Sequence, residues 1–210
     1  MIPVKVLAVR YLANASPALC KALGAPKGYP ALAMLTTDCD DATYIALDEA
    51  TKKAEVKVCY SHSFYAGAAN ATTPNAGEVI GILAGQTPGA VRSGMEAVLS
   101  ALQRLGFEEA GDVPYLAHTV SRSGSFLAQE AGVQEGTPLA YLIAPPLESM
   151  YAMDAAMKAA DVKLCKLYAP PSETNFGGGL LCGSQSACEA ACAAFAQAVA
   201  EFGRIDHANG

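Results

Sequence analysis

The stretch Asp48 to Cys59 (DEATKKAEVKVC) decides the fold, because it recurs as DAAMKAADVKLC from Asp154 to Cys165 at a constant offset of 106 residues. Seven of the twelve aligned positions are identical, and they include paired Asp, Lys, Val and Cys residues that alanine bias does not explain. A self-match at a fixed spacing is the signature of an internal repeat. The chain of 210 residues is therefore predicted to contain two copies of one structural unit.

The match resumes further along each copy, where ILAG at 82–85 aligns with LLCG at 180–183 after a loop that is eight residues shorter in the second copy. Each copy then reads as helix, strand, glycine-rich loop, strand and helix, preceded by an extended segment at 31–37 or 138–144. The pattern predicts long helices near 40–54, 87–104, 146–160 and 184–202, and short ones near 16–23 and 123–131.

This alternation predicts an α/β (α+β) fold of two tandem domains, each a small sheet with antiparallel strands flanked by helices. Gly106, Gly111 and Pro114 interrupt the pattern of strands and helices between the two copies. The predicted domains are therefore residues 1–108 and 109–210. Residues 1–10 read as one alternating strand. Three such chains around one axis would present six similar domains, so the repeat predicts a hexagonal plate made by a homotrimer.

The amino-acid composition argues against several classes of protein. Hydrophobic residues make up 52% and charged residues 16%, so much of the surface is expected to be interface. A net charge of −6 without a basic cluster argues against nucleic acid as a partner. No apolar run of about 18 residues and no export signal are recognisable, which predicts a cytoplasmic protein with no membrane segment. Seven cysteines in that setting are predicted to be reduced thiols.

Beyond the repeat, a series of short motifs is similar to the ethanolamine-utilisation microcompartment shell proteins of L type, a family with tandem, permuted shell (BMC) domains. The resemblance covers nearly the whole chain and departs from the family in a shorter N-terminus and a shorter segment around 104–116. It rests on DCDDATY at 38–44, ALDEAT at 46–51, YAGA at 65–68, AGEV at 76–79, VSRSGS at 120–125, AYLIAPPL at 140–147, PSETNF at 171–176 and GSQSACEAAC at 183–192.

The resemblance implies a non-enzymatic shell protein with no required cofactor, whose flat pseudohexagonal trimer tiles with other shell proteins. It also implies small pores and a central channel opened or closed by loops. Ethanolamine is the expected ligand of the small pores. Cobalamin is a conceivable passenger of the central channel, because the family's pathway depends on a cobalamin enzyme.

Acidic residues are the candidates for the small pores. Asp40 and Asp41 stand where a strand gives way to a helix, and the alternative role there is helix capping and compensation of the helix dipole. Clustered carboxylates would favour a protonated amino alcohol over neutral or anionic solutes. The resemblance associates Asp40, Asp41 and Glu78 with the small pores and ethanolamine, with Phe107 as a neighbouring wall.

Two glycine-rich loops at equivalent positions, 66–77 and 169–179, are the candidates for the central gate, and ordinary long connections are the alternative. Threefold symmetry would bring six such loops around one axis. The residues expected to move are Tyr65, Gly67, Asn70, Glu173, Asn175, Phe176 and Gly177.

Two other functions remain open at this point. A trimeric amine sensor or binding protein of similar fold would use the acidic cluster to signal rather than to admit a solute. A hydrolase or metalloenzyme would use His62 with neighbouring cysteines, but no nucleophile or metal-ligand motif surrounds it, so no catalytic or metal residues are predicted.

Overall fold

The computed structural model describes residues 1–64, 79–170 and 176–207, with side chains up to residue 202. Its residues form two compact units. The first unit consists of residues 3–106 and 124–127, and the second of residues 1–2, 107–123 and 128–210. Each unit thus includes a few residues from the other half of the sequence: residues 124–127 belong to the first unit, and residues 1–2 to the second.

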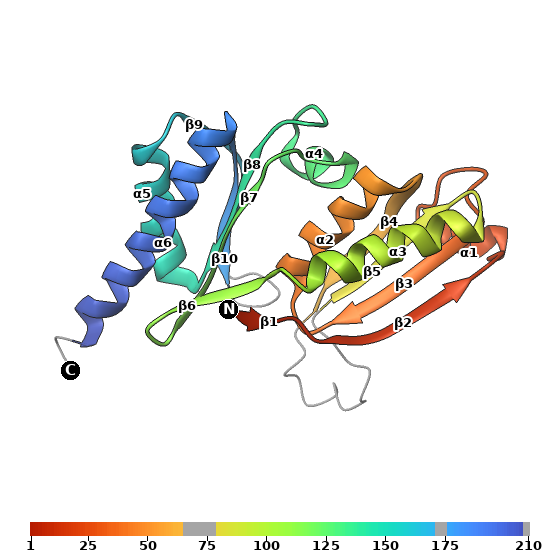
Figure 1. The fold of residues 1–210 in the computed structure, drawn as a ribbon, viewed down its shortest axis with the longest axis horizontal. Helices are drawn as coiled ribbons and strands as arrows, with labels where there is room; N and C mark the ends of the chain where they lie inside the picture. The colour runs from red at the N-terminus through yellow and green to blue at the C-terminus, as the bar shows by residue number, and fades with distance from the viewer. Residues whose placement is uncertain (65–78, 171–175, 208–210) are drawn as a thin grey trace. The chain divides into compact units, whose positions relative to one another are not determined.

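The first unit has one sheet whose described strands follow the order β2-β3-β5-β4, with antiparallel pairing throughout. Helices α2 and α3 lie side by side against it (Figure 1). Its elements are β2 (Val6–Leu12), α1 (Pro17–Ala22), β3 (Ala31–Thr37), α2 (Asp40–Lys53), β4 (Val56–Ser63), β5 (Val79–Gly85) and α3 (Pro88–Leu102).

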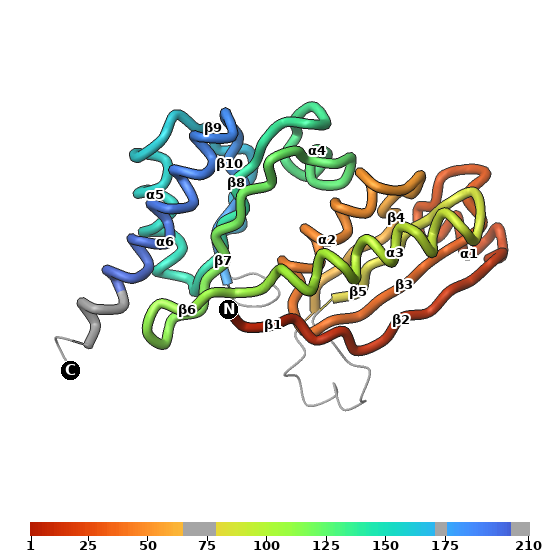
Figure 2. The backbone as a smooth tube through the Cα atoms, in the orientation of Figure 1, coloured from red at the N-terminus to blue at the C-terminus, as the bar shows by residue number. Residues whose placement is uncertain are grey.

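The second unit repeats this order as β7-β8-β10-β9 and adds β6 and β1 at the β7 edge. Helices α5 and α6 run next to each other in it, as the backbone tube in Figure 2 shows. Its elements are β1 (Ile2–Pro3), β6 (Gly106–Ala110), β7 (Val113–Val120), α4 (Ser125–Ala131), β8 (Leu139–Ala144), α5 (Pro146–Ala159), β9 (Val162–Tyr168), β10 (Gly177–Gly183) and α6 (Gln185–His207).

The predicted repeat is present in the packing as well as in the order of elements. In the first unit, a Cβ on Gly81 of β5 would lie 2.7 Å from Leu47 Cδ1 of α2. In the second, a Cβ on Gly179 of β10 would lie 3.1 Å from Met153 Cε of α5. Leu47 and Met153 are 106 residues apart, so equivalent helix residues press on equivalent glycines, where a side chain would not fit.

Local signals explain where the helices begin. Thr87 caps α3 by accepting a hydrogen bond from Ala90 N at 3.1 Å, and Pro88 occupies its first position. Ser184 Oγ accepts from Ala187 N at 3.1 Å at the start of α6. The helices of the described chain begin within two residues of their predicted starts, although α6 extends to His207 rather than ending near 202. A single glycine at 203 does not end it, since one glycine in a helix is tolerated.

The N-terminal strand differs from the prediction of one continuous strand over 1–10. The segment divides into β1 and β2, which belong to different sheets. The break falls at residues 4 and 5, where the Lys5 N–H donates to Asp38 Oδ1 at 2.7 Å and the Lys5 carbonyl accepts from Asp38 N at 3.2 Å.

Each unit has a buried core between its sheet and its long helices. In the second unit, alternate residues of β8 pack against apolar residues of α5 and α6, and Phe195 of α6 is fully buried among them, at 0% exposure. In the first unit the opposite sheet face carries a smaller cluster beside α1, formed by Ala15, Leu32, Ile82 and Ala84. Sheets covered in this way explain the high apolar fraction of the sequence.

Candidate functional site

The turn from β3 into α2 places Asp40 and Asp41 at the start of a helix. Thr37 Oγ1 accepts a hydrogen bond from Cys39 N at 3.2 Å and lies 2.7 Å from Thr43 Oγ1. Thr43 Oγ1 in turn donates to the Cys39 carbonyl at 2.8 Å. The two threonines therefore fix the turn, and both aspartates fall in the first helical turn, where the helix dipole favours negative charge.

Both aspartates are buried within the described chain, with 8% of Asp40 and 7% of Asp41 exposed. Asp40 Oδ1 accepts a hydrogen bond from Asp41 N at 2.9 Å. The Ser63 hydroxyl at the end of β4 is hydrogen-bonded to the Tyr44 hydroxyl. Ser63 also lies beside Asp40, where its hydroxyl acts to lower the pKa of the Asp40 carboxyl.

Burial is the dominant influence on the Asp40 carboxyl. It raises the pKa above the ordinary value of 3.8, and the hydrogen bonds from Ser63 and from backbone amides only partly oppose it. A cation beside the carboxylate would act against the burial effect, because it favours the ionised form. The pair is therefore suited to a positively charged hydrogen-bond donor.

Helix capping was the alternative role for these aspartates. The N-cap residue of α2 is Cys39, whose side chain accepts no capping hydrogen bond. Asp40 satisfies one free amide of the first turn, that of Asp41, so it contributes to the helix start as well.

The other predicted site residues lie elsewhere or outside the described residues. Phe107 is partly buried in β6 of the second unit, where its ring lies 5.7 Å from that of Phe176. Gly177 is the first residue of β10 and pairs with Ala144. The remaining predicted residues, Glu78, Tyr65, Gly67, Asn70, Glu173 and Asn175, lie outside the described residues.

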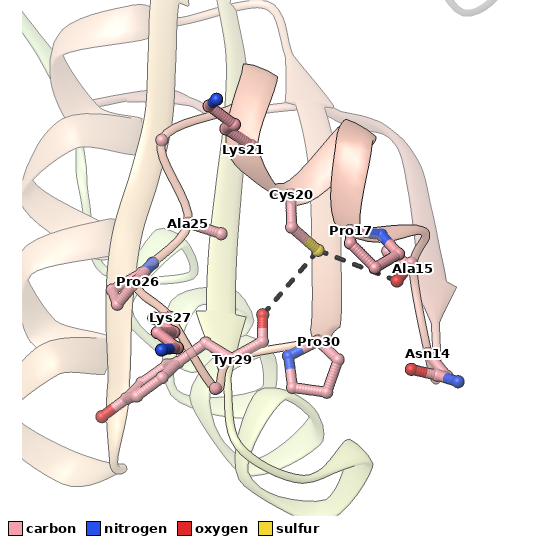
Figure 3. A pocket seen from close by; sticks show the side chains of 12 residues that line it. Asn14, Ala15, Pro17, Cys20, Lys21, Ala25, Pro26, Lys27, Tyr29 and Pro30 are labelled. Carbon is pink, nitrogen blue, oxygen red and sulfur yellow. Dashed lines mark hydrogen bonds between the residues drawn. The ribbon is translucent and has the colours of Figure 1, made fainter.

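A cavity of about 480 Å³ opens in the first unit between α1 and the segment 24–30. Figure 3 shows the Cys20 thiol facing the carbonyl oxygens of Ala15 and Tyr29, at 3.9 and 4.0 Å. Prolines and small apolar groups form most of the remaining wall. Of the predicted pore and gate residues that the structure describes, none lines this cavity.

Within the described part of the chain, no three His, Cys, Asp or Glu side chains are arranged to hold a metal ion. Among the same residues, no helix is both long enough and apolar enough to cross a membrane.

Comparisons with known proteins define the class. A model of the BMC domain matches residues 31–113. The chain is 56% identical to the bacterial microcompartment shell protein EutL of Clostridium perfringens (strain 13 / Type A), over 95% of this chain and 94% of the relative. It is 46% identical to EutL of Salmonella typhimurium, over 97% and 95%. The crystal structure of the ethanolamine utilization protein EutL from Leptotrichia buccalis superposes with a TM-score of 0.94, at 56% identity over 97% of this chain and 95% of that one.

Fold and relatives together define a structural protein of the bacterial microcompartment shell, and not an enzyme. Within that class, the chain belongs to the EutL family. The family predicted from the motifs and the fold of two tandem domains are both confirmed.

Sequence reasoning did not single out Ser63 or Tyr44. Tyr44 carried a usable signal, because it lies four residues after Asp40 on the same helix and so on the same face. Ser63 carried none, since its approach to Asp40 depends on the strand that returns it to the start of α2.

Proposed function

We propose that the chain forms a flat, pseudohexagonal homotrimer that tiles laterally with other shell proteins of an ethanolamine-utilisation microcompartment. The observation that carries the proposal is the repeated strand order, β2-β3-β5-β4 and β7-β8-β10-β9, because three chains then supply six like units to one ring. Membership of the EutL family supports the same assembly.

The small pores of this tile are proposed to bind ethanolamine through Asp40 and Asp41, with Glu78 and Phe107 as further lining residues. Two features of the described residues support this role. Asp40 and Asp41 are consecutive buried acidic residues at the start of α2, and the Asp41 amide donates a hydrogen bond to the Asp40 carboxylate at 2.9 Å. An ammonium group bound here would gain charge-assisted hydrogen bonds in a poorly solvated place, where such bonds are strong.

The first test is calorimetric titration of ethanolamine into the wild type and into a variant carrying Asp40→Asn and Asp41→Asn. The double variant is expected to bind at least about tenfold more weakly, because bonds to charged groups contribute roughly 1.5–3 kcal/mol each. Wild-type affinity should also fall on acidification at a pH above 3.8, since the raised pKa means that Asp40 takes up its proton earlier than an ordinary aspartate.

Glu135→Gln, at an exposed position, is the matched control and should leave the affinity unchanged. Light scattering must show that all variants keep the wild-type oligomer. Unchanged affinity in the double variant would remove the acidic pore from the proposal, while the tile itself would stand.

The central gate is proposed to consist of the two loops at 66–77 and 169–179, with a cobalamin-sized solute as a candidate passenger. The equivalent position of the loops in the two copies supports this, because each connects the pair β4 and β5 or β9 and β10. Strand β10 begins at Gly177, so residues 177–179 of the predicted loop belong to the strand and Phe176 is the last residue before it. The Phe176 ring lies 5.7 Å from that of Phe107, so the proposed movement of the second loop would end beside these two rings.

A further inference from the structure

In the first unit, residues 124–127 cover one face of helix α2. Two of their amides donate to the buried Asp48 carboxylate, at 2.7 and 2.9 Å. The Ser125 amide donates to Thr51 Oγ1 at 3.1 Å. All four residues of the segment are buried or half-buried, so the segment and the helix face bury each other.

The repeat gives this segment an equivalent at residues 16–19. Gly24 and Gly132 are 108 residues apart, and they follow the two short helices with positive φ angles of 72° and 65°. Each donates its N–H to the carbonyl three residues earlier, at 3.2 Å. Counted back from these matching turns, residues 16–19 correspond to 124–127. In the single chain, however, all four residues from 16 to 19 are exposed.

The equivalent face of helix α5 is also exposed in the single chain. At the repeat offset of 106 residues, Asp154 corresponds to Asp48, yet its side chain is 60% exposed. Leu147 and Met157 lie on the same side of the helix and are exposed as well. Together with the half-buried Met150, these residues form the α5 face. Exposed apolar side chains gathered in this way mark an interaction surface.

The polar contact of the first unit has lost both of its partners in the second copy. Where Ser125 donates its N–H, the equivalent residue is Pro17, which has no N–H. Where Thr51 accepts, the equivalent residue is Met157, which has no hydroxyl. A change on one side alone would leave a polar group unpaired on burial. The joint change is what two surfaces that meet each other require.

The aromatic contact has changed in the same paired way. The Phe126 ring lies 6.0 Å from the Tyr44 ring in the first unit. The equivalent residues are Ala18 and Met150, so a small side chain corresponds to one ring and a long, flexible one to the other. Methionine fills irregular apolar gaps well. The second pair of surfaces is therefore apolar where the first is aromatic and hydrogen-bonded.

The carboxylate of Asp154 is not needed to hold the segment. Ser16 Oγ accepts the Leu19 N–H at 3.3 Å, so helix α1 carries its own N-cap. Gly124, the equivalent of Ser16, has no side chain, and the start of α4 depends on Asp48 instead. Asp154 can thus keep its ion pair within α5.

We propose that residues 16–19 of one copy dock on the α5 face of the next copy, as residues 124–127 cover α2. The inference rests on the proposed homotrimer and identifies the contact between its subunits. Leu19 supplies the central apolar side chain, because it is 40% exposed whereas its equivalent, Leu127, is 1% exposed. Each copy gives one surface and receives the other, and three such head-to-tail contacts close a ring.

Charged substitutions in the full chain test the contact by light scattering. Leu19→Asp and Met157→Asp should each abolish the particle of three times the 21.6 kDa chain mass, because each buries an unpaired charge. Adding Met157→Lys to Leu19→Asp should restore that particle, because opposite charges then meet. Glu135→Lys, an exposed charge reversal away from both surfaces, is the control and should stay trimeric.

The outcomes separate this contact from the trimer itself. A wild type that is not trimeric would overturn the proposed assembly and the contact together. A trimeric wild type whose particle mass survives both aspartate substitutions would overturn the contact alone.

Photo-cross-linking of the unmutated sequence gives a second test that does not depend on the folding of variants. The chain is produced with photo-leucine in place of leucine, irradiated and digested with trypsin. Cross-linked dimers should contain the peptide of residues 11–21, which carries Leu19, joined to the peptide of residues 123–158, which carries the α5 face. Fragmentation should locate the bond between 147 and 157. Inter-chain links from Leu19 only to other peptides would overturn the proposal.

Discussion

Replacing Asp48 by alanine is expected to destabilise the first unit by about 3–5 kcal/mol, because it leaves buried donors without partners. Asp48 is 0% exposed, and its carboxylate accepts Gly124 N at 2.7 Å and Leu127 N at 2.9 Å. Lys52 Nζ lies 3.5 Å from it. Burial raises the pKa of Asp48, while the two amides and Lys52 oppose that effect. Denaturant unfolding followed by circular dichroism measures the loss.

The repeat supplies the matched control. Asp154 occupies the equivalent position in the second copy, but it is 60% exposed and pairs with Lys158, itself 75% exposed, at 2.5 Å. Exposed pairs of this kind contribute about 0–1 kcal/mol, so Asp154→Ala should change stability little. Equal losses for the two variants would show that the buried contacts of Asp48 do not carry the effect.

Gly178→Ala is expected to destabilise the second unit by more than about 4 kcal/mol. Single substitutions seldom cause so large a loss, and here the cause would be a clash with the backbone of a neighbouring strand. Gly178 has φ 146°, and a Cβ there would lie 1.9 Å from the Leu142 carbonyl oxygen. Strand β10 lies between β8 and β9, so neither the glycine nor Leu142 can move without breaking the ladder. The readouts are soluble yield and thermal unfolding of the purified variant.

The Gly132→Ala variant separates the energetic cost of a positive φ from the cost of a steric clash. Gly132 also has a positive φ of 65°, but a Cβ there would have no atom of the described residues within 4 Å, so alanine should cost only about 1–2 kcal/mol. If Gly178→Ala were no worse than this control, the close approach of β8 to β10 would not limit the position.

The sequence was sufficient for the repeated fold because the repeat signal is local. The match from Asp48 to Cys59 covers the end of α2 and the start of β4, and its second copy covers the same parts of α5 and β9. Turn and cap residues such as Thr87 and Pro88 then fixed most helix starts.

Contacts between segments that are far apart in the sequence could not be predicted from local patterns. Asp48 and Asp154 look identical in the repeat, yet only Asp48 receives the backbone amides of residues 124 and 127. A Cβ on Gly124 would lie 2.2 Å from Thr51 Oγ1, so only glycine fits at this position. The motif VSRSGS includes this glycine, but the sequence alone gives no reason for it. The hydrogen bond between Tyr44 and Ser63 likewise joins residues that no local pattern relates.

The step from an internal repeat to a shell tile is tested most directly by the mass and shape of the purified protein, from light scattering and then negative-stain microscopy at high concentration. A shell tile should give a particle of three times the 21.6 kDa chain mass that packs into flat hexagonal arrays. A trimer that never packs laterally would favour the amine sensor, which need not tile. A monodisperse monomer or dimer without lateral packing would contradict the step from the repeat to a shell tile.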